Sequence, residues 1–142
     1  MFNRILVVCD GNICRSPTAA AMLMQHCPEK EISSAGLIGL AGYEMDEMAR
    51  KVAQEHGLHC PPHRGRRLSA ELCRKADLIL VMERRQRDEL MSQFPNGSGK
   101  VMLLGHWTGG KDIPDPFRRD QDTFEHVYQL IDQAVAAWLP RL

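Results

Sequence analysis

The stretch Cys9-Asp10-Gly11-Asn12-Ile13-Cys14-Arg15-Ser16-Pro17 decides the fold, because a strand pattern precedes it and a helix pattern follows it. Residues 5–8 read Ile-Leu-Val-Val, a short apolar run that is typical of a buried strand. Residues 18–24 read Thr-Ala-Ala-Ala-Met-Leu-Met, a composition that favours a helix. A strand, a tight turn and a helix N-terminus leave several backbone N–H groups pointing at one spot. The sequence therefore predicts an anion-binding loop at residues 9–17.

The residue types in this loop indicate phosphoryl chemistry. The helix dipole and the free N–H groups favour an anion, and the same field favours the thiolate form of Cys9, which is the nucleophilic form. Arg15 carries a planar fork that can contact two phosphate oxygens. We interpret Cys9 as a nucleophile, Arg15 as a catalytic phosphate ligand, and the rest of the loop as the phosphate-binding residues Asp10, Gly11, Asn12, Ile13, Cys14 and Ser16. The alternative is that Cys9 is a buried strand residue and Arg15 forms a salt bridge elsewhere. This alternative is disfavoured because the motif stands in the expected context, between a strand pattern and a helix pattern.

The remainder of the chain alternates between strand and helix patterns. Apolar strand-like runs lie at residues 4–8, 32–34, 78–82 and 101–104. Helix patterns lie between and after them, at residues 16–26, 45–56, 70–75, 84–93 and 123–139. Such alternation predicts an α/β fold: a single domain over residues 1–142, with a central four-stranded parallel sheet flanked by helices.

A second candidate catalytic residue, Asp115, stands between two prolines in the loop after the fourth predicted strand. In open parallel sheets, ligands bind beyond the carboxyl ends of the strands. That edge is expected to hold Cys9, the segment Ser34-Ala35-Gly36 and the loop at residues 105–120. Asp115 can therefore reach the Cys9 loop as a general acid, although an aspartate between prolines is also a common turn residue.

Composition narrows the classes of protein. Among 142 residues there are 18 Lys and Arg and 18 Asp and Glu, so bulk charge argues against a nucleic-acid or membrane-surface partner. No apolar run approaches the ~18 residues that a spanning helix needs, and no signal peptide is visible. The five cysteines lack the spacing of a disulfide scaffold, which is consistent with a reducing compartment. We expect a cytoplasmic enzyme without membrane insertion.

The chain resembles the low-molecular-weight protein tyrosine phosphatases, whose signature C-x-G-N-x-C-R-S-P matches residues 9–17. The segments Ser34-Ala35-Gly36, 77–83, 99–107 and Ile113-Pro114-Asp115-Pro116 also match the family, so the likeness covers nearly the whole chain. It is most similar to the bacterial branch associated with capsule and exopolysaccharide synthesis. The resemblance implies one parallel-sheet domain that hydrolyses phosphotyrosine through a phosphocysteine, without a metal or other cofactor.

The resemblance also implies roles for individual residues. Ser16 donates a hydrogen bond to the Cys9 sulfur, and Asn12 holds the loop in an unusual backbone conformation. Cys14 is either a small buried side chain, as most free cysteines are, or the partner of Cys9 in a reversible disulfide. Aryl preference implies a deep pocket, for which Leu40 and Phe117 are the wall candidates. The partner implied for the branch is a membrane tyrosine autokinase, and the enzyme is expected to act as a monomer.

Asp10 departs from the family pattern, which usually has an apolar or small residue at this position. A carboxylate beside the loop disfavours both a Cys9 thiolate and an incoming dianion. The cost is small if the side chain points to solvent and larger if it points inward.

Other functions and other sites remain as alternatives. An arsenate reductase of the same fold needs a further redox cysteine pair, whereas residues 81–99 have no cysteine. A phosphocysteine phosphocarrier of sugar transport, or a non-catalytic phosphotyrosine-binding module, has no use for the acid at Asp115. A metal site at His56, His59, Cys60 and His63 is disfavoured by irregular spacing, and Gly97-Ser98-Gly99-Lys100 lacks the Ser or Thr of a nucleotide loop. Arg118 and Arg119 are either a solvated face or a site for acidic residues beside a phosphotyrosine.

Overall fold

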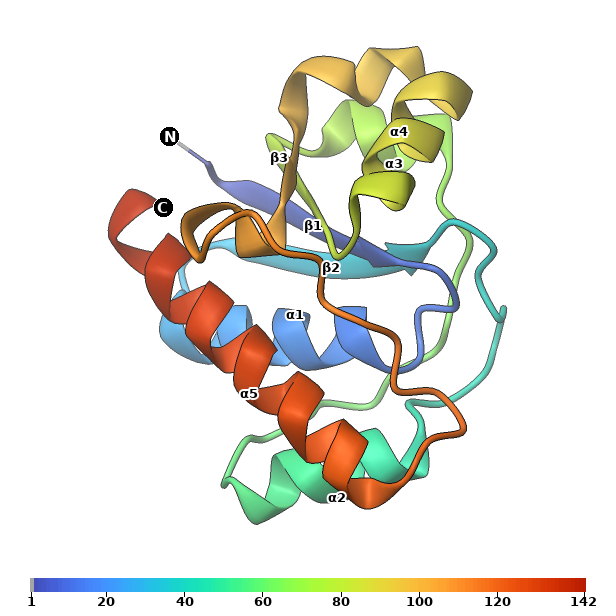
Figure 1. Cartoon of the computed structure of the whole chain (residues 1–142). Helices are drawn as coiled ribbons and strands as arrows, with labels where there is room; N and C mark the ends of the chain where they lie inside the picture. Colours follow the sequence, from blue (N-terminus) through green and yellow to red (C-terminus); the bar gives the residue numbers. More distant parts are fainter. Residues whose placement is uncertain (1) are drawn as a thin grey trace.

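Four parallel strands form the centre of the protein in a computed structural model, which describes residues 2–142 (Figure 1). The strands are β1 (Arg4–Cys9), β2 (Glu31–Gly36), β3 (Leu78–Val81) and β4 (Val101–Leu103). Their order across the sheet is β2-β1-β3-β4, and every neighbouring pair is parallel. The predicted α/β fold with a four-stranded parallel sheet is confirmed.

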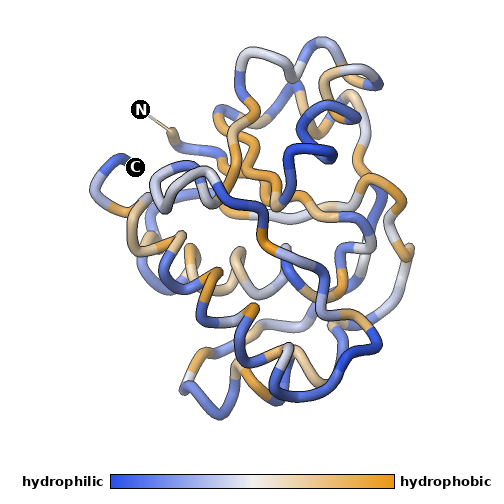
Figure 2. The backbone as a smooth tube through the Cα atoms, in the orientation of Figure 1, coloured by the Kyte–Doolittle hydropathy of each residue, from blue (hydrophilic) through white to orange (hydrophobic). Residues whose placement is uncertain are grey.

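Helices cover both faces of this sheet. Figure 1 shows α1 (Arg15–His26), α2 (Glu47–Glu55) and α5 (Gln121–Trp138) on one side, and α3 (Ala70–Lys75) and α4 (Arg84–Gln93) on the other. Because both faces are covered, the central strands are largely apolar: residues 5–9 of β1 and all four residues of β3 are buried. Figure 2 shows the same contrast, with hydrophobic strands at the centre and a hydrophilic α4 outside.

Two hydrophobic cores follow from the alternation of side chains along the strands. Ile5 and Val7 of β1 belong to the core beneath α1, α2 and α5. Leu6 and Val8 belong to the smaller core beneath α3 and α4. Strand β1 therefore contributes to both cores, and its last residue, Cys9, belongs to the first of them and is 2% exposed.

Helix capping explains where the observed helices differ from the predicted ones. The helix predicted at residues 45–56 begins only at Glu47, because the Asp46 carboxylate accepts hydrogen bonds from the N–H groups of Met48 (2.9 Å) and Ala49 (3.1 Å). The helix predicted from residue 123 begins at Gln121, because Asp120 caps it in the same way.

The other predicted boundaries agree closely with the structure. Helices predicted at residues 70–75 and 84–93 are confirmed at those bounds, and Ser69 caps α3 through the Leu72 N–H at 3.2 Å. The turn predicted near residues 97–100 is part of a short 3₁₀ helix, Pro95–Lys100. A second 3₁₀ segment, Leu104–Trp107, follows β4, and a third, Leu139–Arg141, follows α5.

The topology brings one edge of the sheet together. The register pairs Cys9 with Gly36 and Val8 with Val81, so the loops that follow β1, β2 and β3 start at the same edge. Across residues 2–142, none of the helices combines the length and apolar character needed to cross a membrane.

Candidate active site

The Cys9 thiol lies at the carboxyl end of β1, where the chain turns into α1. Its Sγ is 3.0 Å from the Ser16 hydroxyl and accepts a hydrogen bond from the Asn12 backbone N–H at 3.3 Å. Both groups can donate to a negatively charged sulfur, and so can the N-terminal end of α1 through its dipole. The loop thus surrounds the sulfur with donors.

The backbone of this loop depends on Asn12, which is fully buried and has a left-handed φ of 62°. Its side-chain NH₂ donates to the hydroxyls of Ser16 and Ser34, each at 2.9 Å. Its Oδ1 accepts the Arg66 backbone N–H at 3.0 Å, and the His63 ring nitrogen contacts its backbone carbonyl. These contacts offset the roughly 1–2 kcal/mol that the left-handed conformation costs a non-glycine residue.

Gly36, at the end of β2, allows the sheet to pack directly against the loop. A Cβ at this position would lie 2.4 Å from the Asp10 carbonyl oxygen and 3.0 Å from the Asn12 backbone nitrogen. Any side chain here would push the loop away from β2. This close approach explains the glycine of the Ser34-Ala35-Gly36 segment.

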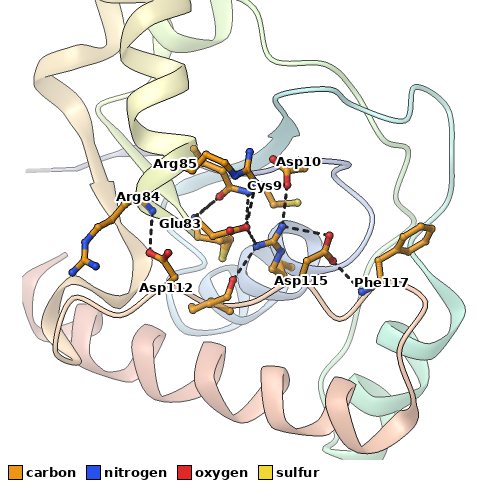
Figure 3. Close-up of polar contacts among 12 residues, drawn as sticks. Cys9, Asp10, Glu83, Arg84, Arg85, Asp112, Asp115 and Phe117 are labelled. Atoms are coloured by element: carbon orange, nitrogen blue, oxygen red, sulfur yellow. Dashed lines mark hydrogen bonds and ion pairs between the residues drawn. The ribbon is translucent and has the colours of Figure 1, made fainter.

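Arg15 is the central cation of the site and is only 2% exposed. Its Nη1 donates to the Glu83 carboxylate and to the Ile113 carbonyl, the latter at 2.9 Å (Figure 3). Its Nη2 lies 3.4 Å from Asp10 Oδ2 and 3.8 Å from Asp115 Oδ2. One side of the guanidinium is therefore fixed, and the other faces two carboxylates at the pocket.

Glu83 is a charged residue of this site to which the sequence analysis gave no role. It stands two positions after Val81, the last residue of β3, and caps α4 together with Gln86. Burial opposes the charge of Arg15, but the neighbouring Cys9 and Glu83 raise the pKa of Arg15 above its usual value. The sequence did contain a signal for Glu83: it is a carboxylate just after a buried parallel strand. Such positions lie at the carboxyl edge of the sheet, where ligands bind.

A pocket of about 180 Å³ opens above the loop, and its walls are largely apolar. Leu40 packs on the loop, and Phe117, 39% exposed, stands at the rim with the Arg118 guanidinium 5.3 Å from its ring centroid. Ile38, which the sequence did not suggest, is also part of the lining. The full lining is Cys9, Asp10, Gly11, Ile13, Cys14, Arg15, Ile38, Leu40, Asp115 and Phe117.

Asp115 lines the same pocket from the loop between β4 and α5. Its Oδ1 accepts the Phe117 N–H at 3.0 Å, which forms a local turn and orients the carboxylate. Its side chain is 46% exposed, so it has access to both the pocket and solvent. The structure thus places the nucleophile, cation and acid candidates around one cavity.

The Asp10 carboxylate is partly buried beside the loop and is paired with two arginines. Its Oδ2 accepts from Arg85 at 2.8 Å and from Arg15 at 3.4 Å (Figure 3). Partial burial opposes its charge, yet the hydrogen bond and charge of Arg85 and the charge of Arg15 lower the pKa of Asp10 below its usual value. The repulsive carboxylate considered from the sequence is therefore an ionised group held between two arginines.

The five cysteines, all within the described residues, are free thiols. Burial, with the charges of Asp46 and Cys9, raises the pKa of the Cys14 thiol far above its usual value. Cys14 is therefore a poor nucleophile in this state, although it shares the pocket lining with Cys9.

Two of the three histidines considered as metal ligands have other partners. His56 stacks on Tyr128 with ring centroids 4.3 Å apart and contacts the Glu125 carboxylate, and His63 contacts the loop. Within residues 2–142, no three His, Cys, Asp or Glu side chains gather into a group that could hold a metal ion.

Comparison with known proteins agrees with the resemblance drawn from the sequence. A family described as low molecular weight phosphotyrosine protein phosphatase matches residues 4–142. The low molecular weight protein-tyrosine-phosphatase Wzb of Escherichia coli K12 is 48% identical over 142 residues, covering 100% of this chain and 97% of the relative. The similarity to Wzb, together with that to AmsI of Erwinia amylovora, confirms the expected membership of the bacterial branch associated with capsule and exopolysaccharide synthesis.

Two solved structures show the same fold. The tyrosine phosphatase AmsI of Erwinia amylovora superposes with a TM-score of 0.97 at 45% identity, covering 100% of this chain and 94% of the other. Vibrio vulnificus Wzb in complex with benzylphosphonate superposes with a TM-score of 0.96 at 45% identity, covering 100% of both chains.

The side-chain amide of Asn12 is expected to contribute to the stability of the folded protein. Asn12→Ala removes three side-chain hydrogen bonds and keeps the left-handed backbone strain, so we expect the free energy of unfolding to fall by about 2–4 kcal/mol. Asn96→Ala, which removes one exposed bond to the Ala70 carbonyl, is the matched control and should cost less than about 1 kcal/mol. Urea denaturation of both variants measures the difference, and equal losses would contradict the role given to Asn12.

Proposed function

This chain belongs to the low molecular weight phosphotyrosine protein phosphatase family, and we propose that this protein tyrosine phosphatase works through a phosphocysteine formed on Cys9. The observation that carries the proposal is the convergence of three groups on one pocket: the Cys9 sulfur, the Arg15 guanidinium and the Asp115 carboxyl. Each supplies one requirement of aryl phosphate hydrolysis, namely a nucleophile, a ligand for the phosphoryl oxygens and a proton donor.

In the first step, the Cys9 thiolate attacks phosphorus, and the bond from phosphorus to the phenolic oxygen breaks. Asp115 gives its proton to that leaving oxygen, so tyrosine departs neutral. Arg15 and the N–H groups of residues 10–16 hold the equatorial oxygens, whose charge dominates the energetics of phosphoryl transfer.

In the second step, water attacks the phosphocysteine. Asp115, now ionised, accepts a proton from this water, and the sulfur–phosphorus bond breaks. Inorganic phosphate leaves, and the Cys9 thiolate and the protonated Asp115 are regenerated. No metal or other cofactor enters either step.

The walls of the pocket support an aryl substrate. Ile13 and Leu40 are apolar and offer contact to a ring, and Phe117 at the rim can stack on it. A phosphoserine is too short to span such walls and reach the sulfur. The benzylphosphonate bound by Vibrio vulnificus Wzb has the same plan of a ring carrying a phosphorus oxyanion.

The alternative chemistries are less well supported. An arsenate reductase would need two further accessible cysteines, but Cys73 on α3 is fully buried and residues 81–99 contain none. A phosphocarrier must keep its phosphocysteine, whereas Asp115 beside the pocket would promote its hydrolysis. Hydrolysis gives a role to both Arg15 and Asp115, which line the pocket beside Cys9.

The similarity to Wzb and AmsI supports a role in exopolysaccharide production. We propose that the substrate is the phosphorylated, tyrosine-rich tail of a membrane tyrosine autokinase, and that the phosphatase meets it in the cytoplasm as a monomer. The exposed rim residues Ile38 and Phe117 offer apolar contacts to the peptide around the phosphotyrosine.

Cys9→Ser is expected to abolish turnover while phosphate still binds, because Arg15 and the loop N–H groups remain. Hydrolysis of p-nitrophenyl phosphate and calorimetric binding of inorganic phosphate measure the two effects. Cys14→Ser, in the same loop, is the control and should keep turnover within about tenfold of wild type. Near-normal turnover by Cys9→Ser would exclude the covalent mechanism.

Asp115→Asn should slow hydrolysis of phenyl phosphate about 10²-fold or more and that of p-nitrophenyl phosphate much less, because only phenolate needs a proton to leave. Asp112→Asn is a matched control in the same loop, since Asp112 caps the Arg84 N–H at 2.9 Å and does not line the pocket. The ratio of kcat for the two substrates is the measurement. An unchanged ratio would show that Asp115 is not the proton donor.

The partner can be tested with the inactive enzyme. Immobilised Cys9→Ser should retain the tyrosine-phosphorylated cytoplasmic part of the autokinase and release it when vanadate fills the pocket. The unphosphorylated kinase is the control. Equal retention of both forms would contradict recognition through phosphotyrosine.

A further inference from the structure

One charged residue outside the catalytic set, Arg85, reaches the phosphate loop from the first turn of α4. Its Nη2 donates to Asp10 Oδ2 at 2.8 Å, and Nη2 of Arg15 contacts the same oxygen at 3.4 Å (Figure 3). Two arginines from different parts of the chain therefore share one carboxylate oxygen. The shorter contact belongs to Arg85.

Asp10 is expected to weaken phosphate binding, because its carboxylate lines the pocket beside Arg15. Glu83 and the Ile113 carbonyl already occupy Nη1 of Arg15, so Nη2 is the end that faces the pocket. A carboxylate paired firmly with Nη2 would compete with the phosphoryl oxygens for the same donor. It would also repel the dianion by its charge.

The geometry around Arg85 counters this competition. The Arg85 guanidinium also contacts Glu89 Oε1 at 2.9 Å and Glu83 Oε2 at 3.4 Å, which fixes its position over Asp10. The hydrogen bond to Asp10, followed by the one to Glu89, raises the pKa of Arg85 above its usual value, so the guanidinium stays charged. Asp10 Oδ1 is buried and has no hydrogen-bond partner among residues 2–142, so the carboxylate relies on its other oxygen.

We propose that Arg85 is a positioning residue for the phosphatase reaction: it holds and neutralises Asp10, which leaves Nη2 of Arg15 free for the phosphoryl group. This inference rests on the phosphatase function proposed above. Arg85 does not line the pocket, so it acts through Asp10 and not by touching substrate. The pair also explains how a carboxylate is tolerated next to the nucleophile.

A double-mutant cycle between Arg85 and Asp10 tests the proposal. The variants are Arg85→Gln, Asp10→Asn and the double variant, with inorganic phosphate as the competitive inhibitor and p-nitrophenyl phosphate as the substrate. Arg87→Gln is the matched control, because Arg87 lies on the same helix and its side chain forms an ion pair with its neighbour Asp88, at 3.6 Å, and not with Asp10. Thermal unfolding checks that each variant is folded.

Arg85→Gln should raise both the inhibition constant of phosphate and KM about five- to tenfold, with kcat within about twofold of wild type. Asp10→Asn should bind phosphate at least as tightly as wild type. In the Asp10→Asn background, Arg85→Gln should change phosphate binding less than about twofold, because no charge remains to compete. Arg85→Lys should restore most of the binding, and Arg87→Gln should leave it unchanged.

Two results would overturn the proposal. An equal loss of phosphate binding in both backgrounds would mean that Arg85 acts through Glu83 or on the phosphate itself. No loss of phosphate binding by Arg85→Gln in the protein that retains Asp10 would mean that Asp10 does not compete with phosphate for Arg15. Either result leaves the covalent mechanism intact, since that mechanism depends on the separate outcome for Cys9→Ser.

Discussion

The buried amide of Asn12 is the interaction on which the site depends. It joins α1 through Ser16, β2 through Ser34 and the segment after α2 through the Arg66 backbone, residues that are up to 54 positions away. A buried amide without these partners would cost several kcal/mol, so the amide and the left-handed turn form together or not at all. Because the loop is fixed before substrate arrives, its N–H groups need little reorganisation when charge develops on the phosphoryl oxygens.

Burial of Arg15 sets a second constraint, because an isolated guanidinium is costly to remove from water. Glu83 meets that cost on one side without blocking the pocket, since it binds Nη1. On the other side, the Asp115 carboxylate stands 3.8 Å from Nη2, and its side chain is 46% exposed to solvent. The fixed carboxylate positions the cation, and the exposed one is the acid and base of the proposed mechanism.

Local patterns allowed most of the fold and the centre of the site to be predicted from the sequence. Strands β1, β3 and β4 were visible because burial on both sides of the sheet gives them continuous apolar runs. Residues 9–17 carry their strand–turn–helix signal within one short segment. The helix starts at Glu47 and Gln121 were missed because the capping role of Asp46 and Asp120 became clear only from their hydrogen bonds to the backbone N–H groups that follow. The closer of the two cationic partners of Asp10, Arg85, is 75 residues away, so no local pattern could reveal this contact.

The pairing of Asp10 with Arg85 also links the site to the stability of α4. Arg84 and Arg85 occupy the first turn of this helix, where the dipole disfavours positive charge. Asp10 and Glu83 supply the negative charge there, and both also contact Arg15. The same two carboxylates therefore offset a buried cation in the pocket and an unfavourable cation at a helix N-terminus. This sharing is possible because β1 and β3 are neighbours in a parallel sheet, which places the β1–α1 loop and the start of α4 at one edge.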